Sequence, residues 1–262
     1  MYMNTILHFF IIFIIIIFYF NIYEQNKSIT SIEIYENDYT NNNELQKICK
    51  TDPIISNMND LYIQPVDLSF NINLNDSKDK SNIIIPYESL NISLQQNKKN
   101  EYYTQHNFIY GEPEFSRFIK PPSCFFANLE ILGGSSNAFT SCVTHNYYRR
   151  FLYVESGNIS IHIKPRKDET VNPDYVNYIF NVTDTDTDTD TVNDSFTDFT
   201  ISRGQMLYIP PNTIYKIVYN EPSILHKYSY HSISSILSNL NHICLYYIQT
   251  TNTENNTLLK KI

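Results

Sequence analysis

The stretch from Gly204 to Asn220 constrains the fold of this chain more than any other. It reads GQMLYIPPNTIYKIVYN, with runs of β-branched and aromatic residues on both sides of a Pro-Pro-Asn sequence. Such residues favour strands, and Pro followed by Asn favours a turn. The stretch therefore predicts a β-hairpin formed by Gln205–Ile209 and Ile214–Tyr219.

Similar short runs recur along the chain, separated by turn residues such as Gly133-Gly134 and Ser156-Gly157. The other predicted strands are Leu61–Ile63, Leu68–Leu74, Ile83–Tyr87, Phe125–Leu132, Phe151–Val154, Asn158–Ile163, Asp174–Val182, Phe199–Ile201 and His242–Ile248. Many short strands at this spacing are typical of an all-β sandwich or a closed jelly roll. One helix is expected from Ser232 to Leu240, because Ile233, Ile236, Leu237 and Leu240 share a helical face.

Charge and cysteine usage exclude two classes of function. The net charge is −8, and nine acidic residues without a single Lys or Arg lie between Asp168 and Asp198, so the rest of the chain is nearly neutral. A nucleic-acid-binding protein needs a concentrated basic face, so we expect no nucleic-acid partner. The four cysteines lack CxxC spacing, which argues against a zinc ribbon and leaves disulfides and free thiols equally open.

The N-terminus carries a strongly apolar run. Ile6 to Phe20 is apolar or aromatic at every position except His8. Because the run lacks a basic leader and a small-residue cleavage site, it predicts an uncleaved signal anchor over residues 1–23. The expected location is therefore a membrane, crossed once by an N-terminal helix. The side of the membrane is left open, because few Lys or Arg flank the run.

The remaining sequence divides by composition. Residues 24–100 are polar and Asn-rich and predict a lead-in with a few strands, and residues 101–250 predict the jelly roll. The acidic stretch at about 168–198 contains a Thr-Asp repeat from Thr183 to Thr191, which predicts a disordered insertion. Residues 251–262 form a polar tail.

The hairpin resembles the second motif of the cupin superfamily, including its JmjC-like oxygenase branch. That motif runs Gly, five residues, Pro, one residue, Gly, two residues, His. Gly204 and Pro210 match it, Asn212 replaces the second Gly, and Tyr215 stands where the family has a metal-binding His. The resemblance implies a double-stranded β-helix, the cupin jelly roll, with an N-terminal membrane helix and a few short helices added to it.

The first motif of the family, His-x-Asp, is expected one hairpin earlier. His145-Asn146-Tyr147 is the nearest counterpart, with Tyr147 in the place of Asp. A second register places Val143 at the His position and His145 at the Asp position. In this register alone, Thr140 matches a Thr that binds the co-substrate. In both registers His145 is the one conventional metal ligand, and the positions filled by Tyr147 (or Val143) and Tyr215 are degenerate.

The resemblance therefore implies the fold more strongly than the activity. We expect a membrane-anchored, non-catalytic binding or scaffolding module with no cofactor and with a protein or small-molecule partner that the sequence does not identify. One alternative is a hydroxylase or demethylase that uses Fe(II) and 2-oxoglutarate with unusual ligands, for which His162, His226, His231 and His242 are candidates. The other alternative is an anchored surface β-sandwich unrelated to cupins.

Overall fold

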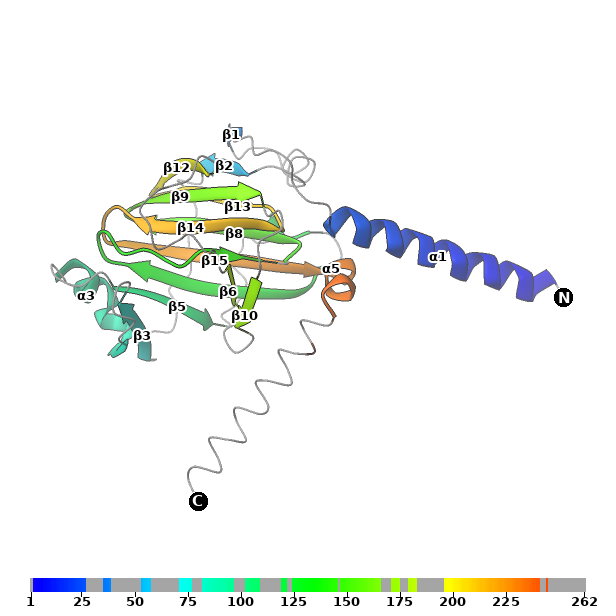
Figure 1. Ribbon diagram of the computed structural model, residues 1–262, viewed down its shortest axis with the longest axis horizontal. Helices are drawn as coiled ribbons and strands as arrows, with labels where there is room; N and C mark the ends of the chain where they lie inside the picture. The colour runs from blue at the N-terminus through cyan, green and yellow to red at the C-terminus, as the bar shows by residue number, and fades with distance from the viewer. Residues whose placement is uncertain are drawn as a thin grey trace, which may run out of the picture.

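The computed structural model describes most of the jelly roll and parts of the N-terminal region. The described residues are 2–26, 35–38, 53–57, 71–76, 82–96, 102–108, 119–121, 124–145, 147–165, 171–174, 179–182, 196–240 and 244. Two sheets dominate the structure, with few helices, so the protein is mostly β (Figure 1).

The first sheet has nine strands and forms one layer of the fold. In spatial order they are β1 (Tyr35–Asp38), β2 (Ile54–Asn57), β13 (Gln205–Ile209), β8 (Arg149–Ser156), β15 (Ser223–Ser232), β6 (Cys124–Gly134), β5 (Tyr102–Phe108), β3 (Asn71–Asp76) and β4 (Asn82–Pro86). Its centre, β13-β8-β15-β6, is antiparallel throughout.

The second sheet has six strands and faces the first. In spatial order they are β10 (Val171–Asp174), β11 (Ile179–Val182), β7 (Val143–Thr144), β14 (Thr213–Tyr219), β9 (Asn158–Pro165) and β12 (Thr197–Ser202). Its centre, β7-β14-β9-β12, is also antiparallel. Chain neighbours β8 and β9 lie in opposite sheets, as do β12 and β13, so the chain alternates between the layers. Two facing four-stranded sheets connected in this way are consistent with the predicted cupin jelly roll.

Two of the turns that the sequence indicated are formed, whereas Gly133 and Gly134, also expected in a turn, lie in β6 and pair with β15 and β5. Asn212, between β13 and β14, has a φ of 58°, and Gly157, between β8 and β9, has a φ of 86°. Asn tolerates this left-handed conformation better than most residues with a Cβ, which explains why it replaces Gly in the motif.

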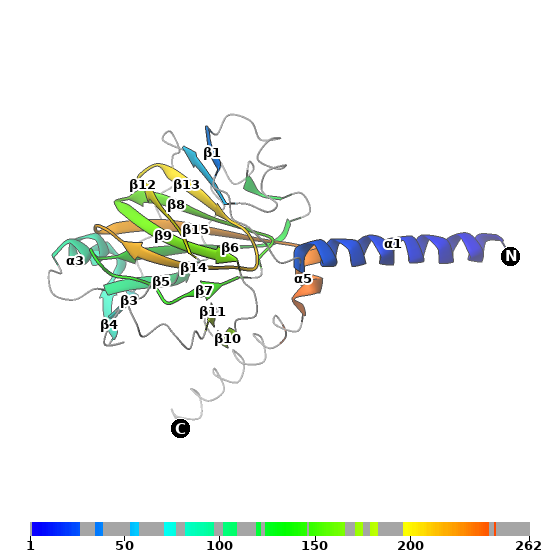
Figure 2. The same cartoon turned by 45° about the horizontal axis from the view of Figure 1, so that its top comes forward.

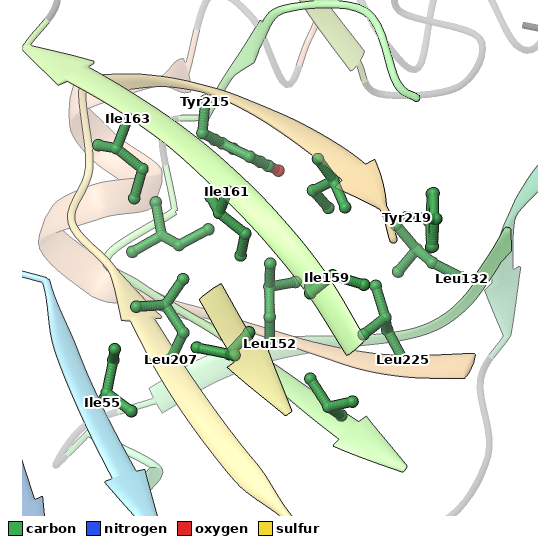
Figure 3. Close-up of a cluster of buried hydrophobic side chains, with 14 of the residues drawn as sticks. Ile55, Leu132, Leu152, Ile159, Ile161, Ile163, Leu207, Tyr215, Tyr219 and Leu225 are labelled. Atoms are coloured by element: carbon green, nitrogen blue, oxygen red, sulfur yellow. The ribbon is translucent and has the colours of Figure 1, made fainter. Parts of the chain in front are cut away.

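An apolar cluster fills much of the interior of the roll. It contains Ile159, Ile161 and Ile163 of β9 together with side chains from β6, β8, β13, β14 and β15, among them Tyr215, and Figure 3 shows them between the sheets. Because alternate residues of a strand face opposite sides, His162 points away from this core and contacts Asp198 of β12 at the surface.

Most predicted strands that fall on described residues are confirmed within a few residues, but β1, β2, β5, β7 and β15 were not predicted. Strand β15 lies at the centre of the first sheet, between β8 and β6, and the sequence reading assigned no strand there. Nearly all of its residues are buried, and its inward face carries Lys227, Ser229 and His231 next to Leu225. Polar residues on a buried face hide the alternation that marks a strand.

Other predictions differ from the structure or lie outside its described part. The single strand expected over Asp174–Val182 is instead two strands, β10 and β11, which pair with each other beside β7. The Thr-Asp repeat, the strand expected at Leu61–Ile63 and most of His242–Ile248 lie outside the described residues.

Four helical segments are described: α1 (Tyr2–Asn26), the 3-10 turn η1 (Tyr87–Ser89), α3 (Leu90–Gln96) and α5 (Ile233–Ser238). The expected helix at Ser232–Leu240 is thus confirmed as α5. Helix α1 projects away from the sheets, and α5 lies beside the end of α1 that is nearest the sheets (Figures 1 and 2).

The N-terminal run forms a helix, but its expected role as a transmembrane segment is not supported. Among the described residues, no helix combines the length and the apolar character that a membrane crossing requires.

Close packing between β6 and β14 leads to a prediction at Gly134. A Cβ at Gly134 would lie 2.3 Å from the Tyr219 ring, whereas one at Gly133 would lie 3.1 Å from the flexible end of Leu94. We expect Gly134→Ala to destabilise the fold by about 1–3 kcal/mol through overpacking and Gly133→Ala to cost much less. Denaturant unfolding of both variants checks this, and equal midpoints would contradict the packing at Tyr219.

Candidate functional site

The three candidate ligand positions lie close together inside the roll. His145 directly follows β7, Tyr147 directly precedes β8, and Tyr215 is the third residue of β14. Strands β7 and β14 pair in antiparallel register, with Val143 opposite Tyr215, and the backbone amide of Asn212 donates to the carbonyl of His145 at 3.1 Å. The second motif is thereby held against the first, as the family resemblance implied.

All three side chains are buried, with exposed fractions of 1% for His145, 2% for Tyr147 and 3% for Tyr215. The His145 ring lies 6.3 Å from the Tyr147 ring and 6.3 Å from the Tyr215 ring, measured between centroids. The register that begins at His145 therefore brings its three positions together. Val143, the strand partner of Tyr215, packs against the apolar core cluster, to which Tyr215 also belongs.

A buried arginine, which sequence reasoning did not single out, links these residues. The Arg150 guanidinium donates from Nη1 to the Tyr215 hydroxyl at 2.9 Å and from Nε to the Ser229 hydroxyl at 3.0 Å. Its central carbon lies 4.7 Å from the centroid of the Tyr147 ring. One positive group thus contacts two of the three positions where the family places metal ligands.

The charge of Arg150 is compensated without a carboxylate. Its side chain is buried, and among the described residues no Asp or Glu lies within ion-pair distance of it. A buried charge is costly unless hydrogen bonds and ring faces replace water around it. Tyr215, Ser229 and Tyr147 supply these contacts, so the two tyrosines have a structural role as partners of Arg150.

Both histidines of the cluster are held neutral. Burial, followed by the positive Arg150, lowers the pKa of His145 well below its usual value, and the carbonyls of Ile209 and Pro210 oppose this only in part. Burial and Arg150 lower the pKa of His231 to about 4. Neither ring nitrogen of His145 has a hydrogen-bond partner of good geometry, so this imidazole alone retains the properties of a metal ligand.

Contacts with His231 and Asn128 hold the Tyr147 side chain in place. His231 stacks on the Tyr147 ring at 4.2 Å between centroids and pairs through Nδ1 with the Ser235 hydroxyl at 2.8 Å. The Asn128 amide donates to the Tyr147 hydroxyl at 3.2 Å. The Asn128 amide also donates to Glu130, which forms a buried ion pair with Lys227. Burial lowers the pKa of Lys227 to about 7.

The other candidates lie elsewhere or serve other contacts. Thr140 accepts a hydrogen bond from the backbone amide of Ile217 at 3.0 Å, which ties it to β14. His226 pairs with Glu155 at 2.7 Å, and His162 is at the surface. His242 lies outside the described residues. Of the proposed unconventional histidines, His231 is therefore the one placed beside Tyr147.

Sequence reasoning missed Arg150, Ser229, Asn128, Glu130 and Lys227. Residues of these types are usually exposed, and the polar signal alone does not distinguish an inward-facing arginine from a surface one. The available signal was indirect. Arg150 directly precedes the apolar run Phe151–Val154 and lies two positions from Leu152, so it shares the inward face of that strand.

The residues present do not fit an iron centre of the oxygenase kind. Such a centre uses two histidines and one carboxylate on one face and keeps positions open for substrate. Among the described residues, no three His, Cys, Asp or Glu side chains gather in a way that would hold a metal ion. The cluster offers the imidazoles of His145 and His231 and two phenols but no carboxylate, and it already contains a guanidinium cation that would repel Fe(II).

Comparisons with known proteins support the fold. The sequence matches no protein-family model and no curated protein. The fold is similar to an X-ray structure of Escherichia coli YcfD, with a TM-score of 0.52 and 13% identity over 86% of this chain and 68% of that chain. A second structure, of YcfD described as a ribosomal oxygenase in complex with cobalt and 2-oxoglutarate, aligns with a TM-score of 0.46 and 13% identity over 69% of this chain and 48% of that chain. The chain thus shares the fold of YcfD at low sequence identity.

The depressed histidine pKa values predict a loss of stability in mild acid. His231 protonates near pH 6.5 when unfolded and near about 4 when folded, so the unfolded chain binds more protons and stability falls as the pH falls between these values. From about pH 7 to pH 5, we expect His231 to contribute a loss of about 2 kcal/mol.

The free energy of unfolding, measured by denaturant titration across this range, checks that prediction. The control is His231→Phe, which keeps an aromatic ring against Tyr147 but cannot be protonated. Its stability is expected to depend less on pH than that of the unmodified protein. Identical pH slopes for the two proteins would contradict the neutral, buried state of His231.

Proposed function

We propose that the protein is a non-catalytic binding or scaffolding module built on a JmjC/cupin-like jelly roll. The observation that carries this proposal is the hydrogen bond from the Arg150 guanidinium to the Tyr215 hydroxyl, at the position of the last metal ligand. Where the family motif has a metal-binding His, this chain has Tyr215, and the side-chain cation of Arg150 contacts it.

Electrostatics support this proposal. Two positive charges a few ångströms apart in a buried site repel by several kcal/mol, even at an effective dielectric constant of about 20. A divalent ion beside Arg150 would face this repulsion with His145 as the one conventional ligand among the three motif positions. The tyrosine hydroxyls also bind poorly, because a phenol must lose its proton, at a pKa of about 10, before it coordinates strongly.

The Fe(II)/2-oxoglutarate oxygenase remains the second candidate. It is favoured by one observation, the presence of two neutral imidazoles, His145 and His231, on the same buried cluster around Tyr147. The third reading, an unrelated β-sandwich, is not retained, because the strand order is that of a jelly roll around His145 and Tyr215.

We also propose that α1 associates with a lipid bilayer. Successive residues of α1, among them Phe9, Phe10, Ile11 and Ile12, are exposed. Because neighbouring residues of a helix are about 100° apart, they cover its whole circumference. The only charged residue in the helix is Glu24, near its C-terminal end, so little opposes transfer of the apolar part into lipid.

The proposal of a non-catalytic module leads to a prediction about iron. The unmodified protein should retain no stoichiometric Fe(II) and form no succinate from 2-oxoglutarate under anaerobic loading followed by oxygen. Tyr147→Asp combined with Tyr215→His should still bind weakly, since Arg150 would pair with the new carboxylate. Adding Arg150→Met should increase metal affinity by about tenfold or more, because the competing cation is gone.

Calorimetric titration with Co(II) and measurement of bound iron distinguish these cases. The matched control is Val143→His with His145→Asp and Tyr215→His, which restores the second register and should bind less tightly. Stoichiometric iron and succinate formation by the unmodified protein would contradict the non-catalytic proposal and favour the oxygenase.

The proposed association of α1 with a bilayer leads to a prediction about lipid vesicles. Ile12→Asp combined with Ile15→Asp should abolish flotation with phosphatidylcholine vesicles, because a buried Asp costs about 2.5–3.5 kcal/mol in a membrane. Ile12→Leu with Ile15→Leu is the matched control and should float as the unmodified protein does. If the unmodified protein does not float, the lipid proposal is wrong, whatever the outcome of the iron experiments.

A further inference from the structure

Helix α5 carries an apolar face that nothing in the described structure covers. Ile233, Leu237 and Leu240 are about half exposed, at 45%, 44% and 50%. Ile233 and Leu237 are four residues apart on one side of α5, and Leu240 directly follows the C-cap residue Asn239. The segment from Ile233 to Leu240 contains no charged residue, so transferring this face out of water meets no charge penalty.

This face is continuous with α1. The two helices are in contact, and in Figures 1 and 2 α5 lies at the end of α1 nearest the sheets. Tyr19 and Tyr23, in the half of α1 toward that end, are exposed at 67% and 59%. Tyrosine is the kind of residue that gathers at the boundary between lipid and water, where its ring is apolar and its hydroxyl is wet.

Helix α5 is fixed to the interior of the roll. Ser232 caps its first turn by accepting from the Ser235 amide, and Asn239 donates to the Ser235 carbonyl at 2.8 Å. The Ser235 hydroxyl pairs with His231, which stacks on Tyr147. A surface that holds α5 would therefore also hold the orientation of the jelly roll.

We propose that Ile233, Leu237 and Leu240 form a second lipid-contacting surface, which lies on the bilayer when α1 inserts and sets the orientation of the roll. This inference rests on the proposed lipid association of α1. A bilayer is the occupant that fits the pair of helices, because the exposed residues of α1 surround its axis. A protein groove covers one side of a helix, whereas acyl chains cover all sides.

The chain contains no Trp, which allows a clean test. Leu237→Trp places a single fluorophore on α5, and Thr200→Trp places one on β12, which both views show away from α5. Each variant is mixed with phosphatidylcholine vesicles, with and without bromine on the acyl chains. We expect a blue shift and strong bromine quenching for Leu237→Trp and neither effect for Thr200→Trp.

Flotation measured on the same samples separates the two proposals. If Leu237→Trp floats with vesicles but is not quenched, the α5 inference is wrong and the association through α1 stands. If it does not float, both are wrong. A blue shift that appears without vesicles and grows with protein concentration would mean that a second copy of the chain covers α5, and would overturn the inference.

A second variant measures the contribution of the face without a reporter. Leu237→Asp combined with Leu240→Asp leaves α1 intact and should weaken vesicle partitioning by about tenfold or more, because two apolar contacts are replaced by charges. Unfolding midpoints equal to that of the unmodified protein establish that the variant is folded. Unchanged partitioning of this folded variant would contradict the inference.

Discussion

The buried cluster of Arg150, Tyr147, Tyr215 and Ser229 depends on one requirement: the charge of Arg150 must be solvated by side chains in place of water. Arg150 enters the roll from β8, and an uncompensated guanidinium there would cost several kcal/mol. Tyr215 from β14, Ser229 from β15 and the Tyr147 ring from the loop before β8 replace its lost water. These contacts cross from one sheet to the other, so satisfying Arg150 also fixes how the two layers face each other.

The same charge determines what the neighbouring groups can do. It depresses the pKa of His145 and of His231 in addition to the effect of burial, so both stay neutral in the folded protein. The Tyr215 hydroxyl already accepts a hydrogen bond from the guanidinium.

The sequence predicted the strands that carry this site better than the buried side chains that form it. Gln205–Ile209 and Ile214–Tyr219 were recognisable because turn residues and strand formers coincide there, and they correctly placed Tyr215 beside His145. Arg150 and Lys227 were not recognisable, because buried cations are rare and their inward orientation depends on strand pairing between β8, β15 and β6. For the same reason β15, the centre of its sheet, was missed.

The central claim is that Arg150 and Tyr215 stabilise each other inside the roll, and a double-mutant cycle tests it most directly. Arg150→Met, Tyr215→Phe and the double variant are unfolded by denaturant beside the unmodified protein. A hydrogen bond to a buried charged group predicts a coupling free energy of about 1.5–3 kcal/mol. A coupling energy within about 0.5 kcal/mol of zero would contradict the account, because the two residues would then act independently.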